Sequence, residues 1–144
     1  MLPWTSVDKI LRASPYFWLA TIDPDGKPHL IQQWFVWIDQ QVFFDGSERT
    51  KWARNLIRDP RVGFGVQSGN DTAYGDGLAD VIRGTPVGLA RRIAAQYGAK
   101  YGRTFKYRPQ AEQYVNGYTF RIKPEKLIAF DVKKFDTSAT RFTF

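Results

Sequence analysis

Hydrophobic residues fall in short runs that predict mainly β structure. Runs rich in β-branched and aromatic residues occupy 17–22, 29–38, 42–44 and 61–67. Such residues favour strands, and Asp-Pro-Asp-Gly at 23–26 is typical of a tight turn. We therefore expect two successive antiparallel hairpins, arranged as a meander, followed by a further strand.

The second half of the chain continues this β pattern less regularly. Turn-forming residues dominate 68–77, which predicts a loop. Alternating or continuous apolar residues predict strands at 79–88, 118–122 and 127–132. The last two are expected to be joined by a turn at 123–126, Lys-Pro-Glu-Lys.

Three helices are expected between these strands. The first lies within 5–15 and is capped by Thr5 or Ser6, the second spans 50–58, and the third spans 90–101. The total is six or seven strands and three helices, without β–α–β alternation. This pattern favours one domain, residues 1–144, built as a mainly β antiparallel barrel with peripheral α-helices.

Composition narrows the kinds of site that the chain can build. It contains no cysteine and one histidine, which excludes disulfides, thiolate metal sites and a histidine metal cluster. A hydrophobic content of 43% supplies a core, and no segment is long and apolar enough to suggest a signal peptide or a membrane span. We therefore expect a cytoplasmic protein. The net charge of +7 favours anionic partners without choosing among nucleotide, nucleic acid and membrane.

Positive charge is concentrated where the strand 42–44 gives way to the second helix. A helix N-terminus offers free N–H groups and the positive end of the helix dipole, which together attract anions. Ser47, Arg49, Thr50 and Lys51 add hydroxyl and charged donors there, so they form a candidate phosphate cradle. The alternative is a solvated helix face, which is the simpler interpretation for the remaining cations, Arg54, Arg58 and Arg61.

Several short motifs follow one another in an order that resembles a known family. They are Ala20-Thr21, Asp25-Gly26, Pro28, Trp34-Phe35, Gly46-Ser47, Arg49, Lys51, Asn55-Leu56 and Asp59-Pro60-Arg61-Val62, with a weaker match at 139–144. The ordered set resembles the pyridoxamine 5'-phosphate oxidase-like proteins, which have a flavin-binding split β-barrel. Within them it is most similar to the small flavin- or deazaflavin-dependent oxidoreductases.

The resemblance implies a homodimeric split β-barrel with two cofactor sites at the subunit interface. It implies FMN, or alternatively a deazaflavin coenzyme, and hydride transfer to or from a small-molecule substrate. It places the cofactor phosphate on the cradle Ser47, Arg49, Thr50 and Lys51. It places the ring system along Ile31, Gln32, Gln33, Trp34, Phe44 and Asp45.

Two other features allow different functions. The segment 91–108 mixes basic and aromatic residues, which suits single-stranded nucleic acid, a cap over an anionic substrate, or an ordinary amphipathic helix. We favour the amphipathic helix, then the cap, and expect no nucleic-acid partner. His29 is expected at the surface, with haem ligation as its alternative. The chain could thus also be a nucleic-acid-binding barrel or a non-catalytic flavin or haem carrier.

Overall fold

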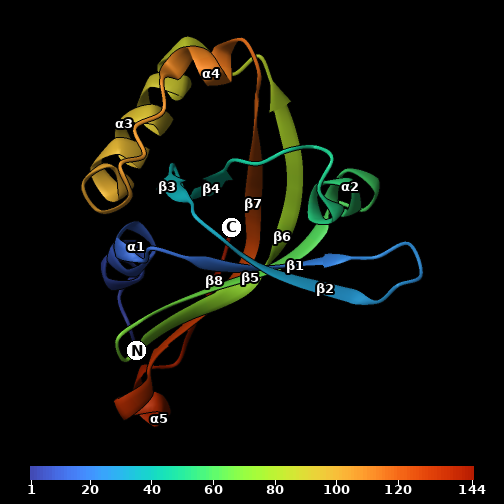
Figure 1. Cartoon of the computed structure of the whole chain (residues 1–144). Coiled ribbons are helices and arrows are strands. Elements are labelled where there is room, and N and C mark those ends of the chain that lie inside the picture. Colours follow the sequence, from blue (N-terminus) through green and yellow to red (C-terminus); the bar gives the residue numbers. More distant parts are fainter.

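The computed structural model describes residues 1–144, and its main feature is one antiparallel sheet curled around a hydrophobic core (Figure 1). The strand order is β2-β1-β5-β6-β7-β4-β3, with β8 paired to β7. The sheet does not close, which agrees with the expected split barrel. The strands are β1 (Phe17–Ile22), β2 (Pro28–Gln33), β3 (Val36–Ile38), β4 (Gln41–Phe44), β5 (Arg61–Ser68), β6 (Asp71–Arg83), β7 (Tyr118–Asp131) and β8 (Thr140–Thr143).

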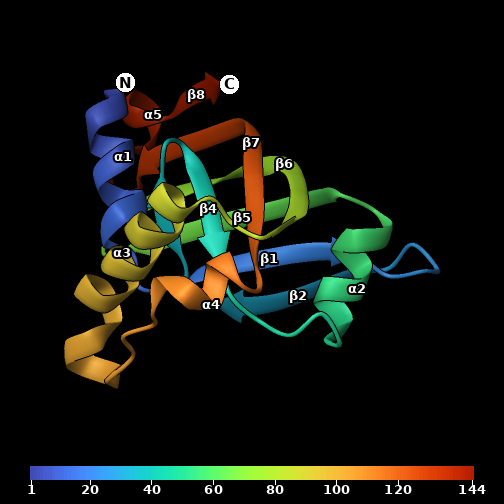
Figure 2. The ribbon, with the colours of Figure 1, turned by 90° about the horizontal axis from the view of Figure 1, so that it is seen from above.

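Five α-helices lie around the sheet. In both ribbon views α1 and α3 lie on one side and α2 on the other, beside the β1–β2 hairpin (Figures 1 and 2). None of the helices is long and apolar enough to cross a membrane. They are α1 (Trp4–Ala13), α2 (Lys51–Arg58), α3 (Val87–Phe105), α4 (Ala111–Val115) and α5 (Phe135–Ser138), with a short 3-10 helix at Val132–Lys134.

The two expected hairpins form, but the meander is wrong. β1 and β2 meet at the expected turn, where Gly26 adopts a φ of 85°. The ten-residue run 29–38 divides at Trp34 and Phe35, so β2 and β3 lie at opposite edges of the sheet. The Phe35 N–H donates to the Tyr101 hydroxyl at 3.0 Å, and Lys100 Nζ donates to the Phe35 carbonyl at 2.9 Å. These side chains satisfy backbone groups that the sheet would otherwise pair.

The loop expected at 68–77 is also wrong, because β6 begins at Asp71 and only Gly69 and Asn70 turn. A Cβ at Gly75 or Gly77 would overlap carbonyl oxygens of β7. These glycines therefore serve the close approach of two strands and do not mark a turn.

One continuous strand, β7, replaces the two strands and turn expected at 118–132. The register shifts by one residue beside its proline, since Asp76 pairs with Lys126 and Gly77 pairs with Pro124. A bulge of this kind accommodates a residue that has no N–H to donate. The strand expected at 79–88 ends at Arg83, and Pro86 precedes the first residue of α3.

Two hydrophobic clusters hold the fold together. The larger cluster fills the barrel with 21 residues and includes the inner face of α1. The smaller one, of eight buried residues, joins α3 and α4 to the outer side of β3 and β4. It contains Tyr97, Tyr101 and Tyr114, and these tyrosines reach the candidate site described next.

Candidate functional site

The loop between β4 and α2 forms as the sequence predicts. Thr50 is the N-cap of α2, and its hydroxyl accepts a hydrogen bond from the Ala53 N–H at 3.3 Å. Ser47 accepts from the Arg49 N–H at 3.1 Å through its hydroxyl. The N–H groups of Lys51 and Trp52 have no partner within the chain. The start of α2 therefore keeps free donors beside the candidate cradle.

The cations of this region fall into two groups. Arg49 and Arg54 are exposed and their side chains form no ion pair or hydrogen bond. Lys51 Nζ lies 3.1 Å from a carboxylate oxygen of Asp23. Arg61 pairs with Asp59 and lowers the pKa of that carboxyl to about 2 through hydrogen bonds.

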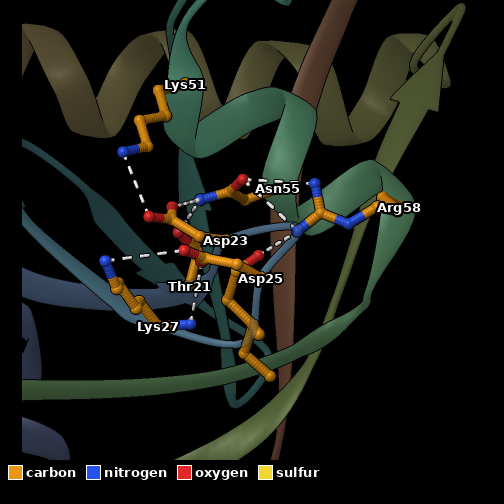
Figure 3. A network of polar contacts seen from close by, with 8 residues as sticks. Thr21, Asp23, Asp25, Lys27, Lys51, Asn55 and Arg58 are labelled. Carbon is orange, nitrogen blue, oxygen red and sulfur yellow. Dashed lines mark hydrogen bonds and ion pairs between the residues drawn. The ribbon is translucent and has the colours of Figure 1, made fainter.

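Arg58 belongs to a polar network that fastens α2 to β1 (Figure 3). Its centre is Asn55, which is 2% exposed and donates to Thr21 Oγ1 at 3.0 Å and to Asp23 Oδ1 at 2.9 Å. Arg58 donates to the Ile22 carbonyl and to Asn55 Oδ1. The Asn55 hydrogen bond is the main cause that lowers the pKa of Asp23, and Lys51 adds to it. Arg58 thus links α2 to β1 through hydrogen bonds, whereas the sequence predicted a side chain surrounded by solvent.

A cavity of about 370 Å³ opens next to this loop. We call it the Asp45 cavity. Its wall combines four aromatic side chains with three polar ones and a glycine, and it contains no lysine or arginine. The lining residues are Tyr16, Gln32, Gln33, Trp34, Asp45, Gly46, Tyr97 and Tyr107.

Asp45 is the one charged group in this wall. Its Oδ2 accepts hydrogen bonds of 2.8 Å from the hydroxyls of Tyr107 and Tyr114. Its Oδ1 is buried and has no partner, and the buried hydroxyl of Tyr97 has none either. Burial raises the pKa of Asp45, and the two tyrosine hydrogen bonds oppose that shift. Buried polar atoms without partners are uncommon, and here two of them belong to residues that line the same cavity.

The ten residues expected to hold a cofactor fall into three places. Four form the loop and the start of α2, namely Ser47, Arg49, Thr50 and Lys51. Four line the Asp45 cavity, namely Gln32, Gln33, Trp34 and Asp45. The side chains of the other two face the barrel core, since Ile31 packs against the larger cluster and Phe44 is fully buried within it. Any contact from Phe44 to a ligand would have to use its backbone.

Three further cavity residues, Tyr16, Tyr97 and Tyr107, were not among those expected to hold the cofactor, although Tyr97 and Tyr107 belong to the segment for which a substrate cap was the second interpretation. The signal for two of them was the interleaving of aromatic with basic residues in 91–108. The structure separates most of the two kinds: Tyr97 and Tyr101 are buried, whereas Arg91, Arg92 and Arg103 are exposed. The exceptions are Phe105, which is exposed, and Lys100, which is half-buried. This is the amphipathic arrangement that we favoured. It also removes both buried tyrosines from any platform for stacking nucleic-acid bases.

Trp34 forms a fixed aromatic wall of the cavity. Its ring lies parallel to that of Tyr101, with an interplanar angle of 9° and centroids 4.6 Å apart. Lys100 on the same helix is turned away to the Phe35 carbonyl and ring, and burial lowers the pKa of its amine to about 7. Lys100 therefore already donates to the backbone between β2 and β3.

His29 lies half-buried at the start of β2, opposite Thr21 in the β1–β2 ladder. No three acidic or histidine side chains are placed to share a metal ion.

One face of the sheet exposes an apolar surface that includes side chains of β1, β2 and β6. Trp18 is 50% exposed, Leu30 62% and Tyr74 44%. The strand pairings place them on the same face as Gly63 and Gly65. A Cβ at Gly63 would meet only ordinary contacts, so nothing in this chain packs closely on that glycine. We call this surface the Trp18 face.

Comparisons with known proteins give a consistent result. A family profile described as pyridoxamine 5'-phosphate oxidase matches residues 4–134. A search of curated protein sequences finds no significant match. The crystal structure of the conserved hypothetical protein Rv2991 from Mycobacterium tuberculosis is similar, with 24% identity and a TM-score of 0.76 over 97% of this chain and 91% of that one.

Two other similar structures are of proteins whose names include a cofactor. A pyridoxamine 5'-phosphate oxidase-related, FMN-binding protein from Nostoc punctiforme is 14% identical, with a TM-score of 0.66 over 100% of this chain and 97% of that one. The haem storage protein HutZ from Vibrio cholerae is 20% identical, with a TM-score of 0.66 over 99% of this chain and 95% of that one. At these identities the likeness concerns the fold.

Proposed function

The chain belongs to the pyridoxamine 5'-phosphate oxidase family, and from this premise we propose that it is a homodimeric oxidoreductase that binds FMN. The observation that carries the proposal is the open cradle at the start of α2. Arg49 has a free guanidinium there, Lys51 lies beside it, and two backbone N–H groups have no partner. Such a donor set fits a phosphate monoester.

Two of the remaining expected residues, Gln32 and Gln33, suit the ring end of a flavin. Gln32 and Gln33 carry amides that both donate and accept, as the edge of the ring requires, and β2 is an open edge strand. When bound, a flavin supplies the hydride chemistry, so the protein needs no nucleophile or metal of its own. The role of this chain is to position the phosphate, orient the ring and provide a pocket for the second reactant.

The Trp18 face supports the proposed homodimer. Three large apolar side chains lie together with two glycines that leave room for a close partner. Contiguous apolar surface of this kind commonly marks a protein interface. Because Trp18 pairs with Gln32 across the hairpin, a second subunit on this face would lie beside the proposed ring site. Each site would then include groups from both copies.

Charge-removal variants test the cradle. Arg49→Ala and Lys51→Ala should each weaken FMN binding by about 1.5–3 kcal/mol, the usual range for hydrogen bonds to charged groups. Arg54→Ala is the matched control, since it removes an exposed and unpaired arginine from the same helix. Fluorescence titration with FMN measures all three affinities. Equal losses of FMN affinity in the three variants would mean that the cluster acts only through its overall positive charge, and would refute the cradle.

Haem carriage is the second candidate, because HutZ shares the fold and the imidazole of His29 makes no hydrogen bond within the chain. The absorbance spectrum of the purified protein separates the cofactors. FMN absorbs at about 450 nm, a deazaflavin at about 420 nm and haem at about 400 nm. A haem spectrum that disappears in His29→Ala would replace the flavin proposal.

A further inference from the structure

The charge in the wall of the Asp45 cavity is opposite in sign to the net charge of the whole protein. The chain carries a net charge of +7, yet no lysine or arginine lines the cavity. The charged group that it does hold is a carboxyl, and the groups that act on this carboxyl are two tyrosine hydroxyls. A ligand that enters the cavity therefore meets one carboxyl, the amides of Gln32 and Gln33, tyrosine hydroxyls and aromatic rings, but no cation of this chain.

The polar atoms in the wall specify what the ligand must offer. Tyr107 and Tyr114 already donate to Asp45 Oδ2, whereas Asp45 Oδ1 and the Tyr97 hydroxyl have no partner. Tyr97 is 1% exposed, so solvent does not satisfy its hydroxyl. A carboxylate oxygen accepts hydrogen bonds, so a complementary ligand must donate one. An anionic ligand would bring a second negative charge to a partly desolvated carboxyl, which is unfavourable.

The aromatic wall specifies the shape. The Trp34 ring is held in one orientation because it stacks on Tyr101. The Tyr107 ring lies beside Trp34, with the two ring centroids 5.8 Å apart. Rigid aromatic faces favour a planar ligand, because offset stacking needs two flat rings. A volume of about 370 Å³ is at the lower end of the range for small-molecule pockets. It suits a small aromatic molecule.

We infer that the Asp45 cavity binds the substrate, and that this substrate is a small planar aromatic compound with an N–H donor and no anionic group. The inference rests on the proposed flavin function, since the substrate would react with a ring held along β2. In this arrangement Trp34 and Asp45 contact the substrate. Gln32 and Gln33 lie between the substrate and the flavin ring. The segment 91–108 then contributes two tyrosines, and none of its basic residues, to the cavity wall.

Three probes of one shape test the charge preference: benzamidine, benzamide and benzoate. Titration calorimetry with FMN-loaded protein at neutral pH should give the tightest binding for benzamidine and the weakest for benzoate. The difference should be about tenfold or more, the factor that one hydrogen bond between charged groups supplies. Asp45→Asn should reduce the preference to about twofold. Asp39→Asn, which removes an exposed carboxylate paired with Arg92, should keep it.

Tyr97→Phe provides a second variant if Asp45→Asn does not fold. It removes the unpartnered hydroxyl, keeps the ring and should weaken benzamide binding without changing FMN affinity. Benzoate binding as tightly as benzamidine, no binding of any probe, or an unchanged preference in Asp45→Asn would overturn the inference. Displacement of benzamidine by FMN would also overturn it, because the cavity would then hold the ring. Absence of FMN binding, with the benzamidine preference intact in cofactor-free protein, would refute the proposed function alone.

Discussion

Replacing Asn55 with alanine tests whether the network in Figure 3 holds α2 on the barrel. The substitution removes the donated hydrogen bonds to Thr21 and Asp23. The first joins neutral groups and is worth about 1 kcal/mol, whereas the second goes to a carboxylate and is worth about 2 kcal/mol. Alanine is a better helix former by about 0.5 kcal/mol, which offsets part of the loss. The net destabilisation expected is about 2.5 kcal/mol.

Urea denaturation at pH 7, followed by tryptophan fluorescence, measures this change as a lower midpoint with an unchanged m-value. The effect should depend on pH. Because the Asn55 hydrogen bond lowers the pKa of folded Asp23, its stabilisation is present above the usual carboxyl pKa and is lost as pH falls through the folded value. The difference between wild type and Asn55→Ala should therefore shrink as the pH falls below about 4.

Two control variants sharpen the result. Arg54→Ala lies on the same helix, is exposed and unpaired, and should change the unfolding free energy by less than about 0.5 kcal/mol. Asn55→Asp keeps the size but replaces a donor with a carboxylate next to Asp23, so it should destabilise at least as much at pH 7 and recover in acid. A loss below about 1 kcal/mol in Asn55→Ala would refute the reasoning.

Two further predictions concern α3 and the Trp18 face. The pKa of Lys100 in the folded protein is about 7, which is below the ordinary lysine value. Between pH 7 and 9 the unfolded chain therefore binds a proton at Lys100 that the folded chain has lost. The unfolding free energy should then rise with pH by up to about 1.4 kcal/mol per pH unit. Denaturation of Lys100→Met should lack this slope, and a slope that persists would assign it to other groups. Trp18→Asp should convert the proposed dimer to a folded monomer in a sedimentation run; an unchanged dimer would place the interface elsewhere.

The parts of the fold that the sequence predicted are those with local signals. The boundaries of β1 follow from its run of β-forming residues and the turn that ends in Gly26. The start of α2 follows from Thr50, because an N-cap bonds to the helix that it begins. The cradle residues were predictable for the same reason, since they belong to one loop and one helix end.

The errors arise where a distant segment decides the local structure. The backbone at Phe35 leaves the sheet because Tyr101 and Lys100 supply its hydrogen bonds. Gly75 looks like a turn residue in the sequence, but its role is set by the approach of β7. Burial raises the pKa of Asp45, and the hydrogen bonds from Tyr107 and Tyr114 oppose that shift; no spacing rule connects these distant tyrosines to Asp45.

The place of β7 in the sheet has a consequence for synthesis of the protein. β7 lies between β6 and β4, yet it follows both of them in the chain, as the pairing of Val42 with Ile122 shows. On the ribosome, β1, β2, β5 and β6 can assemble early, while the β3–β4 hairpin has no neighbour, and a lone hairpin is marginally stable. Until β7 emerges, the edges of β4 and β6 present unpaired backbone groups, which template aggregation. The interval before β7 emerges is therefore the one in which we expect the nascent chain to be most prone to aggregation.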